Sequence, residues 1–250
     1  MNFYFVFEGK TEHIVYKEWL KILLPELSEV DVFDEVENNN YYYESDMGIP
    51  DCYNVVANAI QEINEHPQYD YLVLFVDADR YSVAERKAES FQFIAEKLND
   101  VDKDYIYKKL PENCKLVVIV QKVCIETWFL GNRTFVSRNP ESELLKKYMA
   151  YFDVNKENPE DLGADFTQNK EGTAQIFGYR TKALFHESYL REVFKERLQG
   201  IGYKKNRPRE VQKETYLEQL IARTMDDETH LLSFQEFLTF CEKIKLELAA

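Results

Sequence analysis

The stretch YLVLFVDAD (residues 71–79) combines the clearest strand pattern of the sequence with a pair of acidic residues. Its first six residues are apolar, which is typical of a strand that is buried on both faces of a sheet. Asp77 and Asp79 follow directly after this run. The segment Ser82–Glu85 then has the spacing of a capping box and predicts a helix that continues to about Leu98.

The same succession of strand and helix occurs elsewhere in the first half of the chain. Apolar runs at Asn2–Phe7 and Leu116–Val120 predict two further buried strands. Helices are predicted over Thr11–Leu24, where Pro25 ends the pattern, and over Asp51–Glu65. Since buried strands that alternate with helices pair in parallel, we expect a mostly parallel sheet with helices on both faces.

The segment between these elements is predicted from weaker patterns. Glu29–Val36 alternates weakly and predicts another strand, while the polar segment Asn38–Pro50 predicts a loop. Within that loop lies the triplet Tyr41–Tyr43. Its rings could stack on nucleic-acid bases, or could pack at the surface or against a partner.

From about Gly131 onward the sequence favours helices and loops. Helices are predicted over Glu141–Phe152, Arg180–Leu198 and Glu214–Lys245, and no strong strand pattern occurs there. We therefore expect an α/β protein with a Rossmann-type sheet domain at residues 1–130. A mainly helical part at residues 131–250 is expected to pack on that domain or to be inserted beside it.

Composition limits the classes of protein to which the chain can belong. The 250 residues carry a net charge of −14, with 45% hydrophobic and 30% charged residues, which is typical of a folded globular chain. No apolar stretch has the length of a membrane helix, and the N-terminus lacks the features of a signal peptide. The four cysteines are scattered without metal-binding spacing, so we expect reduced thiols in a cytoplasmic protein.

The negative net charge argues against a general nucleic-acid coat protein, because phosphate binding requires a positive field. It leaves open an enzyme that meets phosphates through bound cations. Acidic residues that hold divalent metal ions present a local positive charge within a negative protein.

Acidic residues follow three of the predicted strands. Glu8 comes after the first strand, Asp77 and Asp79 after the strand of residues 71–76, and Glu126 a few residues after Leu116–Val120. In a parallel sheet these ends lie along one edge, where converging carboxylates repel one another unless cations hold them. Carboxylate oxygens suit Mg²⁺ or Mn²⁺, and the chemistry that such a site serves best is phosphoryl transfer or phosphodiester cleavage.

Each of these signals has a structural alternative. An acidic pair after a strand need not bind a metal, and Gly9 after Glu8 is also typical of a simple turn. Glu126 could be a salt-bridged acid. The combined placement of these acids at successive strand ends is the stronger observation.

The motifs Glu8-Gly9-Lys10-Thr11-Glu12 and Val76-Asp77-Ala78-Asp79 resemble the TOPRIM domain, which topoisomerases, bacterial primases, ribonuclease maturases and OLD-type nucleases share. Together with the later Ile125–Trp128, they are most similar to small stand-alone TOPRIM proteins that are encoded beside ATPases in phage-defence loci. The resemblance covers roughly Asn2–Phe129, and more loosely Tyr179–Phe240.

The resemblance implies specific roles for the acidic residues. Glu8 would act at the reacting phosphate or as a metal ligand, and Asp77 and Asp79 would bind a divalent metal. Glu12 and Glu126 would assist at a second metal. For Glu12 a structural explanation is also open, because an acid is favourable in the first turn of a helix.

Other families with an Asp-x-Asp pair fit less well. A haloacid-dehalogenase-type phosphatase would have a small hydroxyl or β-branched residue after the pair, whereas Arg80 follows here. A glycosyltransferase would leave Glu8 without a role.

The second half adds two basic candidates that the resemblance also covers. Members of the family tend to carry Tyr-x-Lys-x3-His on a helix, and here Lys182 and His186 match while Tyr179 lies one place too far from the lysine. A Ser-Phe motif near the end is matched by Ser233-Phe234. Lys182 could stabilise transition-state charge and His186 could donate a proton, or both could belong to an ordinary helix face.

The densest basic run of the chain is KKNRPR (residues 204–209). Lys204, Lys205, Arg207 and Arg209 could guide a nucleic-acid backbone toward the metals, and a solvated loop is the alternative. No nucleotide-binding P-loop, nucleophile elbow or zinc motif occurs in the sequence.

Two hypotheses about function follow. The first is a metal-dependent TOPRIM nuclease that acts in anti-phage defence, with DNA or RNA as substrate. The second is a dormant or non-catalytic effector whose main task is to bind an ATPase of the ABC or SMC type. A homodimer and the number of metal ions are left open, and no membrane contact is expected.

Overall fold

The computed structural model describes residues 1–45, 47–98, 106, 109–162 and 181–249. The sheet has the strand order β2-β3-β1-β4-β5 and is parallel throughout. Its strands are β1 (Phe3–Phe7), β2 (Ser28–Glu29), β3 (Asn40–Glu44), β4 (Tyr71–Asp77) and β5 (Lys115–Gln121). The predicted α/β fold with a mostly parallel sheet is confirmed.

Strand β1 lies at the centre of the sheet, between β3 and β4. All five of its residues are buried, which explains why its sequence has no polar alternation. Phe7, the last residue of β1, lies opposite Phe75 of β4, so β4 continues two residues beyond the end of β1, to Asp77. This pairing fixes the positions along the sheet at which the segments after β1 and β4 begin.

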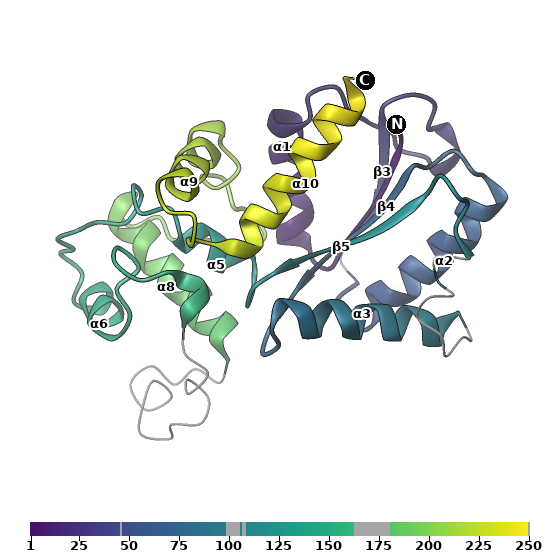
Figure 1. The fold of residues 1–250 in the computed structure, drawn as a ribbon. Coiled ribbons are helices and arrows are strands. Elements are labelled where there is room, and N and C mark those ends of the chain that lie inside the picture. The colour runs from purple at the N-terminus through teal and green to yellow at the C-terminus, as the bar shows by residue number, and fades with distance from the viewer. Residues whose placement is uncertain (46, 99–105, 107–108, 163–180, 250) are drawn as a thin grey trace. The chain divides into compact units, whose positions relative to one another are not determined.

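The chain forms two compact units, and the first contains the sheet strands together with Glu236–Ala250. Helix α1 (Lys10–Leu23) and the later part of α10 (Leu232–Leu248) cover one face of the sheet, where the ring of Phe75 lies 4.3 Å from Tyr16 and 6.2 Å from Phe237. On the other face lie α2 (Asp51–Glu65) and α3 (Val83–Lys97), whose rings Tyr53 and Phe93 stack at 5.4 Å (Figure 1).

The second unit comprises Asp77–Tyr81 and Gln121–Gln235. Its described helices are α5 (Ile125–Leu130), α6 (Glu143–Tyr151), η2 (Pro159–Asp161), α8 (Lys182–Arg197), α9 (Glu214–Asp226) and the first residues of α10. All six residues of α5 are buried, and the Trp128 ring packs on Phe234 at 5.2 Å. Helix α5 is therefore the core of this unit, although it is its shortest α-helix among the described residues.

Two predictions for the segment before α2 were wrong. Glu29–Val36 does not form a strand, because only Ser28–Glu29 pairs with the sheet and a single 3-10 turn, η1 (Phe33–Glu35), follows. The predicted loop Asn38–Pro50 contains β3, which pairs with β1. The tyrosine triplet forms the middle of this strand, since aromatic residues pack well on a pleated surface.

The helix predictions were more accurate. The capping box between Ser82 and Glu85 is present at the start of α3. The predicted helical run Glu214–Lys245 is divided into α9 and α10. The residues Tyr179 and Arg180 of the family-like motif lie outside the described part of the chain.

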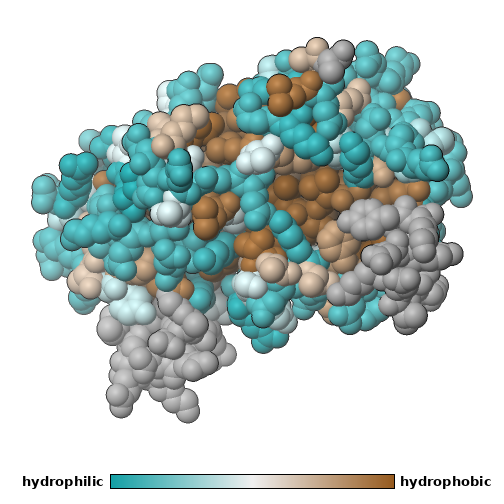
Figure 2. Space-filling view, viewed as in Figure 1, coloured by the Kyte–Doolittle hydropathy of each residue, from teal (hydrophilic) through white to brown (hydrophobic). Residues whose placement is uncertain are grey.

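The polarity of the surface and the state of the cysteines are those expected from the amino-acid composition. Figure 2 shows hydrophilic residues over most of the face that it draws, with apolar residues gathered over β5. All four cysteines are buried free thiols. None of the helices in the described residues is long and apolar enough to span a membrane.

Candidate functional site

Glu8 is the first residue after β1, and its backbone is held on both sides. Its N–H donates to the Phe75 carbonyl at 3.1 Å, which extends the β1–β4 pairing by one residue. Its carbonyl accepts from the N–H of Gly48 at 2.8 Å. Gly48 has a φ of +66°, a conformation that glycine adopts without strain. The backbone therefore fixes the point at which the Glu8 side chain leaves the sheet.

Gly9 makes room for a second carboxylate at the same strand end. A Cβ atom at residue 9 would lie 2.6 Å from Oε2 of Glu12, closer than such contacts allow. The Glu12 side chain, in the first turn of α1, is buried and folds back over the turn. The glycine of the Glu-Gly-x-x-Glu motif therefore leaves space for the end of the Glu12 side chain.

Asp77 and Asp79 lie where β4 ends and the chain turns toward α3. The N–H of Ala78 donates to the Gln121 carbonyl, and that of Asp79 to the Val123 carbonyl, both at 2.8 Å. Asp79 and Val123 both have positive φ, 52° and 69° respectively. For a β-branched residue such as Val123 this conformation is strained, and such strain concentrates at functional sites.

The sheet register relates the ends of β1 and β4. These strands are parallel neighbours, so Glu8 and Asp77 both stand at the carboxyl edge of the sheet. Ligand sites of open parallel sheets form beyond this edge. The sequence-based expectation that the acids follow neighbouring strand ends agrees with the topology.

Glu126 lies in the first turn of α5 and is fully buried. Its Oε1 accepts a hydrogen bond from the Tyr203 hydroxyl at 2.9 Å and lies 3.5 Å from Nζ of Lys205. Its Oε2 is buried and has no hydrogen-bond partner among the described residues. A buried carboxylate oxygen in this state costs free energy, so it is a natural position for a cation or a donor from a ligand.

Lys205 joins Glu126 to further acids of the second unit. Its Nζ also lies 3.7 Å from Oε2 of Glu187. Burial alone would lower the pKa of the Lys205 amine, but the negative charges of Glu126, Glu187 and Asp77, with the Cys124 thiol, outweigh it and raise the pKa. We call Glu126, Lys205, Tyr203, Glu187, Thr127 and His186 the Glu126 cluster.

His186 and Lys182 both lie on α8, as their spacing predicted. His186 is fully buried, and its Nδ1 lies 2.8 Å from the Thr127 hydroxyl, next to Glu126 in the chain. Burial, with the nearby charge of Lys182, lowers the pKa of His186 to about 3. The imidazole is therefore neutral at pH 7, and a proton-donor role for it stays a prediction.

The basic residues of the run 204–209 differ in their contacts. Lys205 is shared between two carboxylates, while Lys204, Arg207 and Arg209 are exposed. Burial lowers the pKa of Lys182, and the charge of Lys122 lowers it further. The nucleic-acid contacts predicted for the run stay predictions.

Ser233, from the Ser-Phe pair, belongs to a buried hydrogen-bond network that sequence reasoning missed. Its hydroxyl accepts from the indole N–H of Trp128 at 2.7 Å and donates to the carboxylate of Glu160. Burial raises the pKa of Glu160 although the Ser233 hydrogen bonds oppose the shift. Glu160 stands in a polar segment of the sequence, and nothing in its surroundings there marks it as buried.

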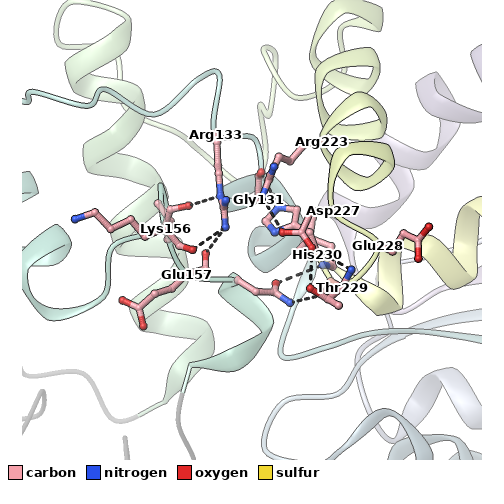
Figure 3. Close-up of polar contacts among 12 residues, drawn as sticks. Gly131, Arg133, Lys156, Glu157, Arg223, Asp227, Glu228, Thr229 and His230 are labelled. Atoms are coloured by element: carbon pink, nitrogen blue, oxygen red, sulfur yellow. Dashed lines mark hydrogen bonds and ion pairs between the residues drawn. The ribbon is translucent and has the colours of Figure 1, made fainter.

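A second polar cluster lies elsewhere in the same unit (Figure 3). Arg133 donates to three backbone carbonyls, those of Val154, Lys156 and Glu157, at 3.1 to 3.2 Å. The ring of His230 is buried, and its Nε2 donates to the Gly131 carbonyl at 2.9 Å.

Asn158 completes this second arrangement. Its amide donates to the Thr229 carbonyl at 3.0 Å, and its Oδ1 accepts from the N–H of Leu231 at 3.4 Å and of Glu160 at 3.2 Å. We call Arg133, Asn158 and His230 the Arg133 corner. The side chains of the Arg133 corner form hydrogen bonds with backbone groups and thereby hold the neighbouring loops in place.

The acids of the second unit carry the type of ligand that a hard divalent cation prefers. Asp77 and Asp79 at the end of β4 and Glu126 in α5 have carboxylate oxygens, and one buried oxygen of Glu126 has no hydrogen-bond partner among the described residues. Glu8 belongs to the first unit. Within the described part of the chain, no group of three or more His, Cys, Asp or Glu side chains is arranged to hold a metal ion. Mg²⁺ is commonly bound by one or two carboxylates together with water and substrate phosphates, so a smaller donor set is sufficient for it.

Comparison of the chain with protein-family models, with curated proteins and with solved structures finds no match.

Proposed function

We propose that this protein is a divalent-metal-dependent enzyme that cleaves phosphodiester bonds of nucleic acid, with a TOPRIM-like use of its strand ends. The observation that carries the proposal is the parallel pairing of β1 and β4, with Glu8 directly after β1 and Asp77 as the last residue of β4. The strained backbone of Val123, whose carbonyl accepts the N–H of Asp79, supports it.

In this proposal Asp77 and Asp79 hold Mg²⁺ or Mn²⁺, and Glu8 acts at the reacting phosphate or as a further ligand. Glu126 and Glu12 contribute to a second metal position. A bound ion would supply charge stabilisation for the phosphate and a more acidic water molecule.

The residues of the chain have their own tasks. The backbone hydrogen bonds of Glu8 fix the position of its Cα atom, from which the side chain extends, so that little reorganisation of the backbone is needed when substrate binds. Lys182 and His186 lie on α8. The contact of His186 with Thr127 connects α8 to α5, the helix that carries Glu126. Lys204, Arg207 and Arg209 would meet the nucleic-acid backbone.

The test is cleavage of plasmid DNA and of total RNA by purified protein, with Mn²⁺, with Mg²⁺ and with EDTA. Glu8→Gln and Asp77→Asn should each reduce metal-dependent cleavage by at least about 100-fold. Glu18→Gln and Asp226→Asn are matched controls, since both acids lie on helices away from the strand ends. Cleavage at the wild-type rate in both strand-end variants would contradict the proposal.

A second function is favoured by a specific contact. The Glu126 carboxylate is already engaged by Tyr203 and Lys205, as expected of a site that is held inactive. In this alternative the protein is a dormant effector in anti-phage defence that binds an ATPase of the ABC or SMC type in the cytoplasm. A stable complex on size-exclusion, together with no metal binding by calorimetry, would favour it over the enzyme.

A further inference from the structure

The end of α8 and the segment that follows it form a pocket of about 400 Å³. Its wall contains three arginines, Arg197, Arg207 and Arg209. The pocket lies within the second unit, and its volume is in the range of small-ligand sites.

The charge of this pocket is opposite to that of the chain. The net charge of the protein is −14, yet the three arginines are exposed, and in the described part of the chain none of them forms an ion pair. Among the described residues that line the pocket only Glu210 is acidic, and both of its oxygens bind Lys213, at 2.7 and 2.8 Å. The guanidinium groups of Arg207 and Arg209 are therefore left for a ligand from solution, while that of Arg197 lies over the Phe135 ring, 5.9 Å from the ring centroid.

The floor of the pocket is apolar and fixed. The rings of Phe194 and Tyr203 lie 5.7 Å apart, and both residues are buried. Gly202 lets the loop approach α8 closely, because a Cβ there would lie 3.0 Å from Cγ of Arg191. Gly200, with a φ of +97°, turns the chain at the end of the helix. The apolar floor of the site is thus formed before any ligand arrives, which reduces the ordering cost of binding.

We propose that this pocket binds a phosphate ester, either a free nucleoside monophosphate or the phosphorylated end of a nucleic-acid strand. Arginine is suited to this ligand, because its planar group donates two parallel hydrogen bonds to phosphate oxygens. Three residues with such groups line this one cavity.

The pocket is connected to the Glu126 cluster through one residue. Tyr203 lines the pocket and donates its hydroxyl to Glu126 at 2.9 Å. If the proposed cleavage holds, a strand end in the pocket would lie beside a residue of the catalytic site, and this part of the inference rests on the proposed function. The binding itself needs neither metal nor cleavage.

The experiment is calorimetric titration of the full chain in EDTA, which separates binding from catalysis. The probes are inorganic phosphate, AMP, and a short oligonucleotide with either a 5′-phosphate or a 5′-hydroxyl. We expect AMP or the phosphorylated oligonucleotide to bind, and the double variant Arg207→Gln/Arg209→Gln to weaken that binding at least about tenfold. The double variant Lys243→Gln/Lys245→Gln removes the same charge from α10 and should leave the affinity unchanged.

The pattern of probes identifies the source of the phosphate. Binding of AMP, with no preference between the two oligonucleotides, identifies a free nucleotide as the ligand. Preference for the 5′-phosphate over both AMP and the 5′-hydroxyl identifies a strand end. No binding of any probe to the wild-type protein, or equal affinity in the wild type and the arginine variant, would overturn the inference, whatever the outcome of the cleavage assay.

Discussion

The second unit contains two polar clusters that use similar residue types in opposite ways. In the Glu126 cluster, ionisable side chains meet one another, as in the contact of Glu126 with Tyr203 and Lys205. In the Arg133 corner, side chains bind backbone carbonyls, and Arg133 alone satisfies three of them.

This difference distinguishes polar side chains that stabilise the fold from polar side chains that are suited to binding or catalysis. The three hydrogen bonds of Arg133 tie its side chain to the backbone carbonyls of Val154, Lys156 and Glu157, so their benefit is stability. The Glu126 cluster keeps a charged pair, a buried carboxylate oxygen without a hydrogen-bond partner among the described residues, and a neutral imidazole, which cost stability. A cost of this kind is expected where a ligand or a reaction uses the groups.

The largest effect should come from the Arg133 corner. Arg133→Ala leaves the carbonyls of Val154, Lys156 and Glu157 without their donor, and we expect the free energy of unfolding to fall by about 3 kcal/mol. Urea unfolding measures this change, with the exposed Arg138→Ala as the control. A loss similar to that of the control would show that the corner is not structural.

The next effect is a pH dependence that belongs to the Glu126 cluster. The pKa of His186 is about 3 in the folded protein and about 6.5 in the unfolded chain, so between these values only the unfolded chain binds the proton. Stability therefore falls as the pH falls, by about 2.5 kcal/mol between pH 6 and pH 4.

Unfolding of the wild type and of His186→Gln at both pH values measures this contribution. The variant should lose less stability on acidification than the wild type does. His66→Gln, at an exposed histidine, is the control and should behave as the wild type. The same loss in all three proteins would mean that His186 is protonated in the folded state.

A third test concerns activity. Glu126→Gln keeps an acceptor for the Tyr203 hydroxyl but removes the charge, and we expect metal-dependent cleavage to fall about tenfold. Glu12→Gln should have a smaller effect, because an acid in the first turn of α1 is favourable for the helix alone. If Glu126→Gln equals the wild type across a Mg²⁺ titration, Glu126 is structural and the site shrinks to Glu8, Asp77 and Asp79.

The smallest effect should come from a single amide of the Arg133 corner. Asn158→Ala removes hydrogen bonds to Thr229, Leu231 and Glu160, and we expect a loss of about 1 kcal/mol in the free energy of unfolding. Thermal or urea unfolding measures it against Asn206→Ala in an exposed loop. A loss as large as that of Arg133→Ala would mean that the two residues act as one unit.

The two clusters also differ in how far the sequence predicts them. Glu8, Asp77 and Asp79 could be found because they follow apolar strands, and strand ends in a parallel sheet share an edge. Glu126 could be found for the same reason. Their partners could not be found, since the contacts of Tyr203 and Lys205 with Glu126 cross almost eighty residues of chain.

The fold shows the same limit. Buried strands such as β4 are read directly from continuous apolar runs, and the capping box of α3 fixes its first turn. Strand β3 was missed because its polar and aromatic residues gain their order from pairing with β1, which is a tertiary interaction. The Arg133 corner was missed because hydrogen bonds to backbone carbonyls leave no mark on side-chain spacing.

The order of segments in the first unit has a consequence for synthesis. Tyr16 and Phe75 are made early, but the ring of Phe237 that packs against both belongs to the late segment Glu236–Ala250. While the ribosome is still translating, the face of the sheet under α10 lacks this cover, and an apolar surface stays open to chaperones and proteases. A chain cut short before residue 236 would keep Glu8, Asp77 and Asp79 but would lack the ring of Phe237, so this part of its core would stay uncovered.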